Sequence, residues 1–392
     1  MDKVKFGVIG VGNMGSAHAK RFLKGEVENA VLTAVCDLKQ ARLEAIRSLN
    51  GGESVELFHD YTQMLKSGLV DAVIVATPHY FHPEMVIAAL EAGLHVICEK
   101  PAGVYTKQVK EMNAAAEKSD KLFTMMFNQR TNCVYRKIRE MVTSGELGEL
   151  RRINWIVTDW YRSQSYYDSG DWRATWKGEG GGVLMNQCPH QLDLLQWVTD
   201  MMPSRIHAFC HFGKWHDIEV EDDVTAYLEY DNGATGVFVT TTGDAHGDNR
   251  FEVQMDKARI IVEDDKLSLL EFEVSEPEWS KTTTQTFATL PAKEVEVETD
   301  GENPQHVGVL NAWAGAILRG EPLVAGGEEG INGLTLSNAM HLSAFLGQKV
   351  EIPFDEELYY QELMKRVATS RRKTGGKVVF TDTSNSYNGS KA

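Results

Sequence analysis

The first third of the chain alternates short apolar runs with stretches of helical character. The apolar runs, which are typical of buried strands, occupy residues 6–9, 31–36, 55–58, 72–76, 94–98 and 122–127. The helical stretches lie between them, at residues 16–23, 40–49, 84–92 and 106–119. Near-continuously apolar strands that alternate with helices predict a parallel sheet covered on both faces.

From about residue 128 the pattern changes to strands in which apolar and polar positions alternate. The strand-like segments are 150–157, 205–212, 224–230, 234–242, 251–255 and 259–263, and the helical ones are 134–142, 189–198, 306–319 and 328–346. Asp231-Asn232-Gly233, between two of the strands, is typical of a hairpin turn. We predict an α/β chain with a parallel-sheet domain at 1–127, a second domain with a mostly antiparallel sheet at 128–370, and a polar tail at 371–392.

A glycine-rich turn follows the first predicted strand. In Gly10-Val11-Gly12-Asn13-Met14-Gly15, the first glycine allows a tight turn, Gly12 lets a pyrophosphate approach the backbone, and Gly15 lets helix and strand pack closely. The N-terminus of the following helix supplies N–H groups and a positive dipole for phosphates. This order of strand, turn and helix predicts a dinucleotide site built from Gly10, Gly12, Asn13, Met14 and Gly15; the less favoured alternative is an ordinary βαβ turn.

The second strand ends in Asp37, whose carboxylate can accept hydrogen bonds from the adenosine ribose hydroxyls. Because the same carboxylate repels a 2′-phosphate, the sequence favours NAD over NADP. Lys39 and Arg42 lie close enough in sequence to oppose that preference.

Length and charge narrow the class of protein. A chain of 392 residues, 42% hydrophobic and 24% charged, fits two globular domains. A formal net charge of −16 argues against nucleic acid or an anionic membrane as partner. We expect no membrane span and no signal peptide. The five cysteines are scattered without CxxC spacing, which predicts reduced thiols and a cytoplasmic protein.

Asp37, Thr77 and Lys100 all follow predicted strands, so they should share the rim where ligands of such sheets bind. Lys100 can donate to a substrate oxygen and stabilise an alkoxide. The alternative is a surface lysine paired with Glu99.

A second candidate stretch runs from Gly180 to Asp193. Pro189 suits the first position of a helix, which places His190 in the opening turn and Asp193 on the same face, where it can orient the imidazole. Histidine is the side chain best suited to exchanging a proton near neutral pH. The alternative is a structural histidine, with Asp193 interacting favourably with the helix dipole.

An aromatic and glycine-rich loop fills residues 159–182. It contains Trp160, Tyr161, Arg162, Tyr166, Tyr167, Trp172, Arg173 and Trp176. Aromatic rings stack on sugar faces and arginines donate to hydroxyls or carboxylates, so the loop suits a polyol pocket; cover of the sheet or a subunit interface is an equal alternative. Of His207, His211 and His216, which could suggest a metal site, the first two lie four apart in a strand, about 13 Å from one another, and we predict no metal site.

With these residues identified, the chain closely resembles the Gfo/Idh/MocA oxidoreductases, the family of glucose–fructose oxidoreductase and inositol dehydrogenase, from Phe6 to about Arg366. The motifs that carry the resemblance are the 10–15 glycine turn, residues 76–82, Glu99-Lys100-Pro101 and residues 180–193. The resemblance implies an N-terminal Rossmann domain, a C-terminal α+β domain with a large open sheet, a bound nicotinamide cofactor and sugar or polyol substrates. It also implies a homodimer or homotetramer formed through that sheet.

The resemblance also assigns roles. Lys100 matches the family's lysine, before a cis peptide to Pro101, and His190 matches its histidine. Asn186 stands where the family usually has aspartate; it can hold a hydroxyl but cannot take its proton. His79 stands where asparagine is frequent, beside the nicotinamide. The implied cofactor contacts add Thr77, Pro78, His79, His82, Glu99 and Lys100 to the glycine turn and Asp37, and the implied substrate contacts are Lys100, Trp160, Arg162, Trp172, Arg173, Asn186 and His190.

The sequence therefore favours an NAD-dependent dehydrogenase acting on a secondary hydroxyl of a sugar, glycoside or cyclitol. His190 would accept the hydroxyl proton, Lys100 would polarise the oxygen, Asn186 would position it and Asp193 would hold the imidazole. Two alternatives stay open. One is a redox-assisted glycosidase that releases an aglycone without net NADH, and the other is a cofactor-binding regulatory subunit without turnover.

Overall fold

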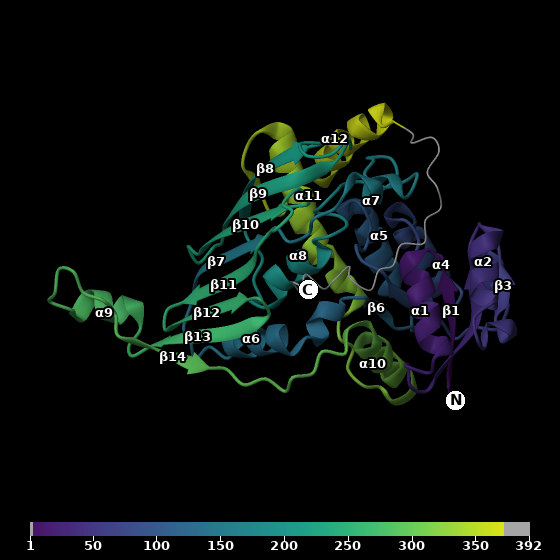
Figure 1. The fold of residues 1–392 in the computed structure, drawn as a ribbon, viewed down its shortest axis with the longest axis horizontal. Coiled ribbons are helices and arrows are strands. Elements are labelled where there is room, and N and C mark those ends of the chain that lie inside the picture. The colour runs from purple at the N-terminus through teal and green to yellow at the C-terminus, as the bar shows by residue number, and fades with distance from the viewer. Residues whose placement is uncertain (1–2, 372–392) are drawn as a thin grey trace.

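A computed structural model describes residues 3–371, so the predicted tail at 371–392 lies, apart from Arg371, outside the described residues. The chain forms two sheets that lie side by side, with helices packed between and around them (Figure 1). The first sheet has six strands in the order β3-β2-β1-β4-β5-β6, and every pair is parallel. The predicted parallel sheet is therefore confirmed.

The elements of the first sheet follow the predicted alternation closely. Its strands are β1 (Val4–Ile9), β2 (Ala30–Cys36), β3 (Glu56–Phe58), β4 (Ala72–Val75), β5 (His95–Cys98) and β6 (Phe123–Met125). Its helices are α1 (Asn13–Leu23), α2 (Gln40–Arg47), α3 (Tyr61–Leu65), α4 (His82–Glu91) and α5 (Thr106–Ala116). All four residues of β4 are buried, as expected of a central strand covered by helices on both faces.

Two glycines of the turn after β1 are required by geometry. Gly10 has a φ of 87°, a conformation that side chains other than glycine rarely adopt. A Cβ at Gly15 would lie 1.9 Å from the carbonyl oxygen of Gly10, so α1 packs against β1 at a distance that only glycine permits.

The second sheet has nine strands in the order β14-β13-β12-β11-β7-β10-β9-β8-β15. Its strands are β7 (Leu150–Val157), β8 (Arg205–Phe212), β9 (Glu221–Glu229), β10 (Thr235–Thr241), β11 (Asn249–Met255), β12 (Ala258–Glu263), β13 (Lys266–Phe272), β14 (Ala292–Glu296) and β15 (Val350–Glu351). Only β7 and β10 pair in parallel. The prediction of a mostly antiparallel sheet is confirmed.

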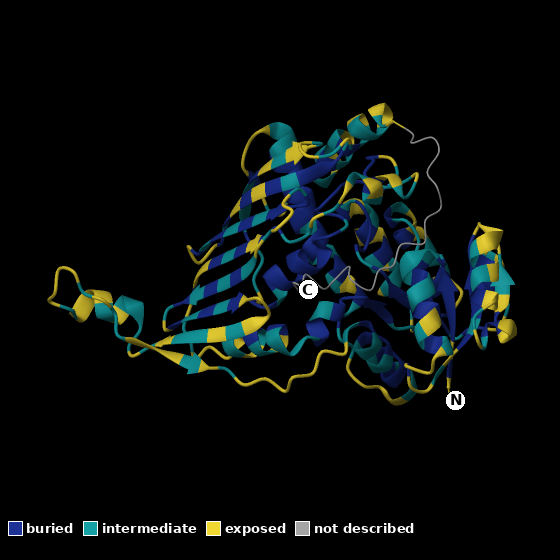
Figure 2. Cartoon of the chain, viewed as in Figure 1, coloured by how far each residue is buried: buried dark blue, intermediate teal, exposed yellow. Residues whose placement is uncertain are grey.

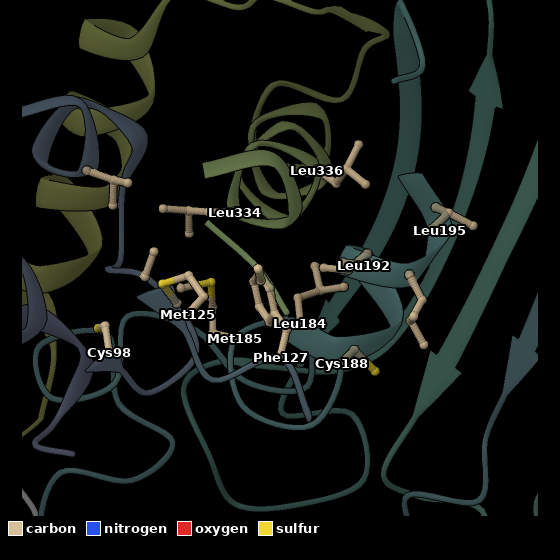
Figure 3. Packing of buried hydrophobic residues seen from close by; sticks show 14 of the residues in the cluster. Cys98, Met125, Phe127, Leu184, Met185, Cys188, Leu192, Leu195, Leu334 and Leu336 are labelled. Carbon is tan, nitrogen blue, oxygen red and sulfur yellow. The ribbon is translucent and has the colours of Figure 1, made fainter. Parts of the chain in front are cut away.

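One face of this sheet packs on helices, so along its strands buried positions alternate with intermediate or exposed positions of the other face (Figure 2). The helices of this half are α6 (Cys133–Thr143), α7 (Gln164–Asp168), α8 (Pro189–Trp197), α9 (Glu276–Thr282), α10 (Gln305–Arg319), α11 (Gly330–Leu346) and α12 (Glu356–Thr369). On the inner face Trp155 of β7 is fully buried and packs on Tyr135 of α6. Side chains from β5, β6, α8, α11 and the loop that leads into α8 form one apolar cluster (Figure 3).

Several elements were not predicted, among them α3, α7, α12 and the arm formed by β13, α9 and β14, which projects from the sheet (Figure 1). None of the residues of α9 is buried, and β14 has only intermediate and exposed positions. Such segments lack the apolar periodicity on which a sequence-based prediction depends.

Helix α10 returns to the first sheet. Trp313 is fully buried, lies 5.0 Å from Phe6 of β1 between ring centroids, and shares a core with Leu310 and Val309. By sequence α10 falls in the proposed domain at 128–370, yet it completes the core of the proposed domain at 1–127. The division of the chain into these two domains remains a proposal.

Replacing Leu310 with alanine should lower the free energy of unfolding by about 2–5 kcal/mol, because it opens a cavity between α10 and the first sheet. Leu38→Ala is the matched control: Leu38 is 87% exposed, and its loss should change stability by about 0.5 kcal/mol or less. Urea unfolding followed by circular dichroism measures both. Equal effects would show that α10 does not contribute to this core.

Candidate active site

The cofactor end of the site is formed by the turn after β1 and by Asp37 at the end of β2. One oxygen of Asp37 accepts from the backbone N–H of Val11 at 3.1 Å and from Arg42 at 3.2 Å, and the other accepts from the N–H of Lys39 at 2.8 Å. Asp37 is 8% exposed. These bonds hold the carboxylate against the glycine turn. The positive charge of Arg42 partly offsets its negative charge.

The turn itself fits a dinucleotide. Gly12 precedes α1 without any side chain to cap its N–H groups, and a Cβ at Gly12 would find only Arg42, 3.9 Å away, within van der Waals range. Backbone N–H groups at an open helix N-terminus suit a pyrophosphate. The residues present therefore fit NAD: Gly12, Asn13 and Met14 would lie along the phosphates and Asp37 at the ribose, while Gly10 and Gly15 allow the turn and the close packing of α1 on β1.

The rim continues at the ends of β4 and β5, where two histidines join neighbouring loops. Nε2 and Nδ1 of His82 lie 2.7 and 2.8 Å from the carbonyl oxygens of Thr77 and Pro101, beside the cis peptide bond between Lys100 and Pro101 that the resemblance implied. His79 bonds the carbonyl oxygen of Glu179 through Nδ1 at 3.1 Å. Burial, assisted by nearby His82 and Lys100, holds the pKa of His79 well below its usual range, so the ring is neutral.

Lys100 points from the end of β5 toward the glycine stretch of the second half. Its Nζ donates to the backbone carbonyl of Asn186 at 2.7 Å, whereas the side chain of Glu99 bonds His18 at 2.6 Å. The alternative of a surface ion pair between Lys100 and Glu99 therefore does not describe this geometry. Burial lowers the pKa of Lys100, and the charge of Glu99 opposes that shift.

His190 lies in the first turn of α8, which Pro189 begins as predicted, and is 1% exposed. Burial first, and then the positive charge of Lys100, holds the pKa of His190 well below its usual range. The imidazole is therefore neutral and close enough to Lys100 to feel its charge.

Asp193 accepts hydrogen bonds from Arg130 and Gln196. Nε and Nη2 of Arg130 donate to the two carboxylate oxygens at 2.8 and 2.6 Å, and Nη1 contacts Glu329 at 2.6 Å. Both Arg130 and Asp193 are almost fully buried. These bonds anchor α8, the helix that carries His190, and the role of Asp193 in orienting the imidazole stays a prediction.

Asn186 lies at the centre of a hydrogen-bond network. Its Oδ1 accepts from the hydroxyl of Tyr166 at 3.0 Å, and its Nδ2 donates to Oε1 of Glu179. Arg173 donates to the same Tyr166 hydroxyl at 2.7 Å and lies 3.9 Å from Glu179. Glu179, at 2% exposure, is the functional candidate that sequence reasoning missed. The feature of the sequence that could have identified Glu179 is a carboxylate directly before Gly180, seven residues before Asn186.

The aromatic loop brings some predicted substrate residues to this network and leaves others at its edge. The guanidinium of Arg173 lies over Tyr166 and Trp172, at 4.5 and 4.9 Å from the ring centroids. The edge of Trp172 meets His79 at 5.6 Å, so the loop reaches the cofactor rim. Arg162 stacks between Trp160 and Tyr166 at 5.5 and 5.3 Å.

Within residues 3–371 no group of three or more histidine, cysteine or acidic side chains is arranged to hold a metal ion. His216, one of the histidines considered for a metal, instead bonds Asp222 at 3.0 Å and the carbonyl oxygen of Arg162 at 2.8 Å. Over the same residues, no helix has the length and apolar character needed to cross a membrane.

Fold and site together define an NAD-binding oxidoreductase. Residues 4–127 match the model of an oxidoreductase family with an NAD-binding Rossmann fold, and residues 135–261 match the GFO/IDH/MocA C-terminal domain. The chain belongs to the Gfo/Idh/MocA family, as the resemblance in its motifs indicated.

Relatives within this family act on cyclitols and sugars. A Thermotoga maritima protein named myo-inositol 2-dehydrogenase is 26% identical over 267 residues, covering 66% of this chain and 75% of that protein. The D-glucoside 3-dehydrogenase of Escherichia coli is 31% identical over 248 residues, covering 59% and 68%. The WlbA dehydrogenase of Chromobacterium violaceum, solved with NADH and UDP-GlcNAcA, has a TM-score of 0.77 at 28% identity, covering 91% of this chain and 97% of that one.

Behind Lys100 and His190 lies a buried group formed by His18, Glu99 and His306. His306, in the first turn of α10, lies 5.6 Å from the ring of His18. Burial raises the pKa of Glu99, but the hydrogen bond and charge of His18 outweigh it and bring the value to about 2. Burial and the charge of His18 lower the pKa of His306 to about 3.

His306 should make the protein sensitive to acid. Between its ordinary pKa of 6.5 and about 3, the unfolded chain binds a proton at His306 and the folded protein does not, so stability falls as the pH falls. His306→Gln should make the slope of unfolding free energy against pH shallower by about 1.4 kcal/mol per pH unit near the middle of that window.

Urea titrations at a series of pH values measure that slope, and the same change at the exposed His246 controls for loss of a histidine as such. An unchanged slope in His306→Gln would mean that His306 is protonated in the folded protein.

Proposed function

We propose that this chain is an NAD-dependent dehydrogenase that oxidises a secondary hydroxyl of a sugar, glycoside or cyclitol. One observation carries the proposal: Nζ of Lys100 is held on the backbone carbonyl of Asn186, in the stretch that leads to the buried, neutral imidazole of His190. A cation and a neutral imidazole together are what removal of a hydroxyl proton needs, because the cation stabilises the alkoxide and the imidazole can receive a proton.

The reaction follows from these positions. NAD, when bound, supplies the acceptor for the hydride that leaves the hydroxyl carbon. Lys100 polarises the hydroxyl oxygen, Asn186 positions it, and His190 is the first group to receive its proton. Because Lys100 is already fixed on a backbone carbonyl, its side chain loses little conformational entropy when substrate binds.

The substrate class is supported by the loop as well as by the relatives. Arg173, stacked on Tyr166 and Trp172, and Arg162, stacked on Tyr166, offer donors for hydroxyls or a carboxylate. Related proteins of the family are named for inositol and for glucosides. Both are rings that carry several secondary hydroxyls.

Subunit contacts form a further part of the proposal. The outer face of the second sheet exposes Phe209 of β8, Tyr227 of β9 and Ile156 of β7, at 60%, 44% and 41%. We propose that this face joins two or four copies of the chain. The cysteines, all free thiols, suit the cytoplasmic location that we propose for the protein.

Purified protein should convert NAD and one member of a panel of sugars, inositols and glycosides into NADH and a ketone in equal amounts. Mass spectrometry of ketone, aglycone and cofactor, repeated with NADP, measures this. Release of aglycone without net formation of NADH would identify the protein as a redox-assisted glycosidase instead of a dehydrogenase. Tight NAD binding with no turnover on the whole panel would instead favour a regulatory subunit.

His190→Ala should lower kcat by about 10²–10⁴-fold, because it removes the first acceptor of the hydroxyl proton. The dissociation constant of NADH, followed by fluorescence, should change little, since the phosphates and the adenosine ribose bind elsewhere on the rim. His246→Ala at an exposed loop position is the control. Wild-type turnover in His190→Ala would remove this histidine from the mechanism.

A further inference from the structure

Arg173, in the aromatic loop at residues 159–182, has a guanidinium whose hydrogen-bonding capacity is mostly unused. The group lies over the rings of Tyr166 and Trp172. Within residues 3–371, the hydrogen bond that it makes runs from Nη1 to the hydroxyl of Tyr166, at 2.7 Å. A guanidinium carries several N–H donors in a planar fork. Because the side chain is 14% exposed, the remaining donors can meet a ligand but are not surrounded by water.

The carboxylate of Glu179 does not occupy this fork. It lies 3.9 Å from Nη1 of Arg173, beyond hydrogen-bond distance. Its Oε2 accepts from the backbone N–H of Ala174 at 2.6 Å, and its Oε1 accepts from the side-chain amide of Asn186. Both oxygens of Glu179 are thus bonded elsewhere, and its contact with Arg173 is not the bidentate one that a guanidinium favours with a carboxylate.

The backbone beside Arg173 is strained, and hydrogen bonds hold it in that conformation. Ala174 is buried and has a φ of 54°, which residues with a Cβ rarely adopt. Its N–H is bonded to Glu179, and its carbonyl oxygen accepts from the N–H of Glu219 at 3.3 Å. Strain of this kind is concentrated at binding and catalytic sites, where the surrounding structure imposes it. The position of Arg173 is therefore fixed by its own segment of the loop.

Arg173 lies close to the position that we propose for the reacting hydroxyl. The hydroxyl of Tyr166 accepts from Arg173 and donates to Oδ1 of Asn186 at 3.0 Å, so one small ligand can contact both side chains. Burial lowers the pKa of Lys100, and the charge of Arg173 adds to that shift, although Glu99 opposes it. The guanidinium is therefore near the ammonium that stabilises the alkoxide in the proposed reaction.

Oxidation of a hydroxyl does not need this second cation. Lys100 already supplies positive charge for the alkoxide, and neutral groups such as Asn186 can hold the hydroxyl. A largely buried cation without a direct ion pair costs free energy, because it has been removed from water. Stacking on two aromatic rings offsets part of that cost. A negative charge on the substrate would offset more of it and would use the free donors.

We propose that the substrate is an acidic sugar, whose ring carries a carboxylate, and that Arg173 binds this carboxylate through its planar fork. This rests on the proposed function and selects the acids among the sugars, glycosides and cyclitols that it allows. A neutral hydroxyl would accept from one donor of the fork, whereas the two oxygens of a carboxylate match two parallel donors and also the charge. Arg173 is thus a residue that determines which substrates are used.

Purified protein with NAD is tested on pairs of compounds that differ in the carboxylate: glucose and glucuronate, galactose and galacturonate, and the methyl glycosides of each. For at least one pair, kcat/KM should be about 10²–10³-fold higher for the acid, because a poorly hydrated charge pair discriminates strongly. Equal or lower values for the acid in every pair that is oxidised would overturn the proposal. A higher value for glucose 6-phosphate than for either uronate would also overturn it, since phosphate would then be the group recognised.

Substitution of Arg173 links this preference to the guanidinium. In Arg173→Met the ratio of kcat/KM for the acid to that for its neutral partner should fall to about 1, because charge and fork are both lost. This ratio cancels any general loss of active enzyme. Arg173→Lys, which keeps the charge without the fork, should give an intermediate ratio. Arg47→Met, at an exposed position near the end of α2, is the matched control. A wild-type ratio in Arg173→Met would overturn the proposal.

Calorimetric titration of glucuronate and galacturonate into the complex with NADH tests the site without turnover. At least one acid should bind, and Arg173→Met should weaken its binding by about 10²-fold or more. If it does so while wild-type protein oxidises nothing on the panel, the dehydrogenase function fails and the acid site stands. If neutral sugars are oxidised and neither acid binds, the proposal of an acidic substrate fails alone.

Discussion

The bond from Lys100 to the backbone carbonyl of Asn186 is the contact on which the site depends. Lys100 leaves the end of β5 in the parallel sheet, whereas Asn186 belongs to the stretch that leads into α8, so the bond joins cofactor residues to substrate residues. A partly buried ammonium needs a partner, and the carbonyl supplies one without neutralising the charge. The ammonium is therefore positioned without a carboxylate bonded to it, so its charge is not offset by a direct ion pair.

Two further contacts keep that bond in register. The ion pair between Arg130 and Asp193 fixes α8 against the segment after β6, and His82 ties the end of β4 to Pro101. These side chains carry no chemistry of their own in the proposed reaction. They hold the two stretches that do, because a fully buried and doubly bonded pair cannot shift without leaving a charge unpaired.

Much of the fold could be predicted because its periodicity is strong, and the rest could not because it depends on distant contacts. The run 72–76 is apolar throughout and became the central strand β4, while the arm around α9 buries nothing and left no pattern. At the site, Lys100 and His190 were predictable from turns and caps in their own neighbourhoods. The pairing of Asp193 with Arg130 brings together residues that no local spacing relates, and the burial of Glu179 depends on packing that its own neighbourhood in the sequence does not show.

The return of α10 to the first sheet has a consequence for synthesis of the chain. Trp313 covers Phe6, so the apolar surface at β1 has no complete cover until the ribosome has passed that residue. Domains at the N-terminus usually fold first during translation. Here the strands of the nucleotide-binding sheet leave the ribosome early, but its core is complete only after α10 has been synthesised. Until then the apolar side of β1 is the surface that a chaperone would have to protect.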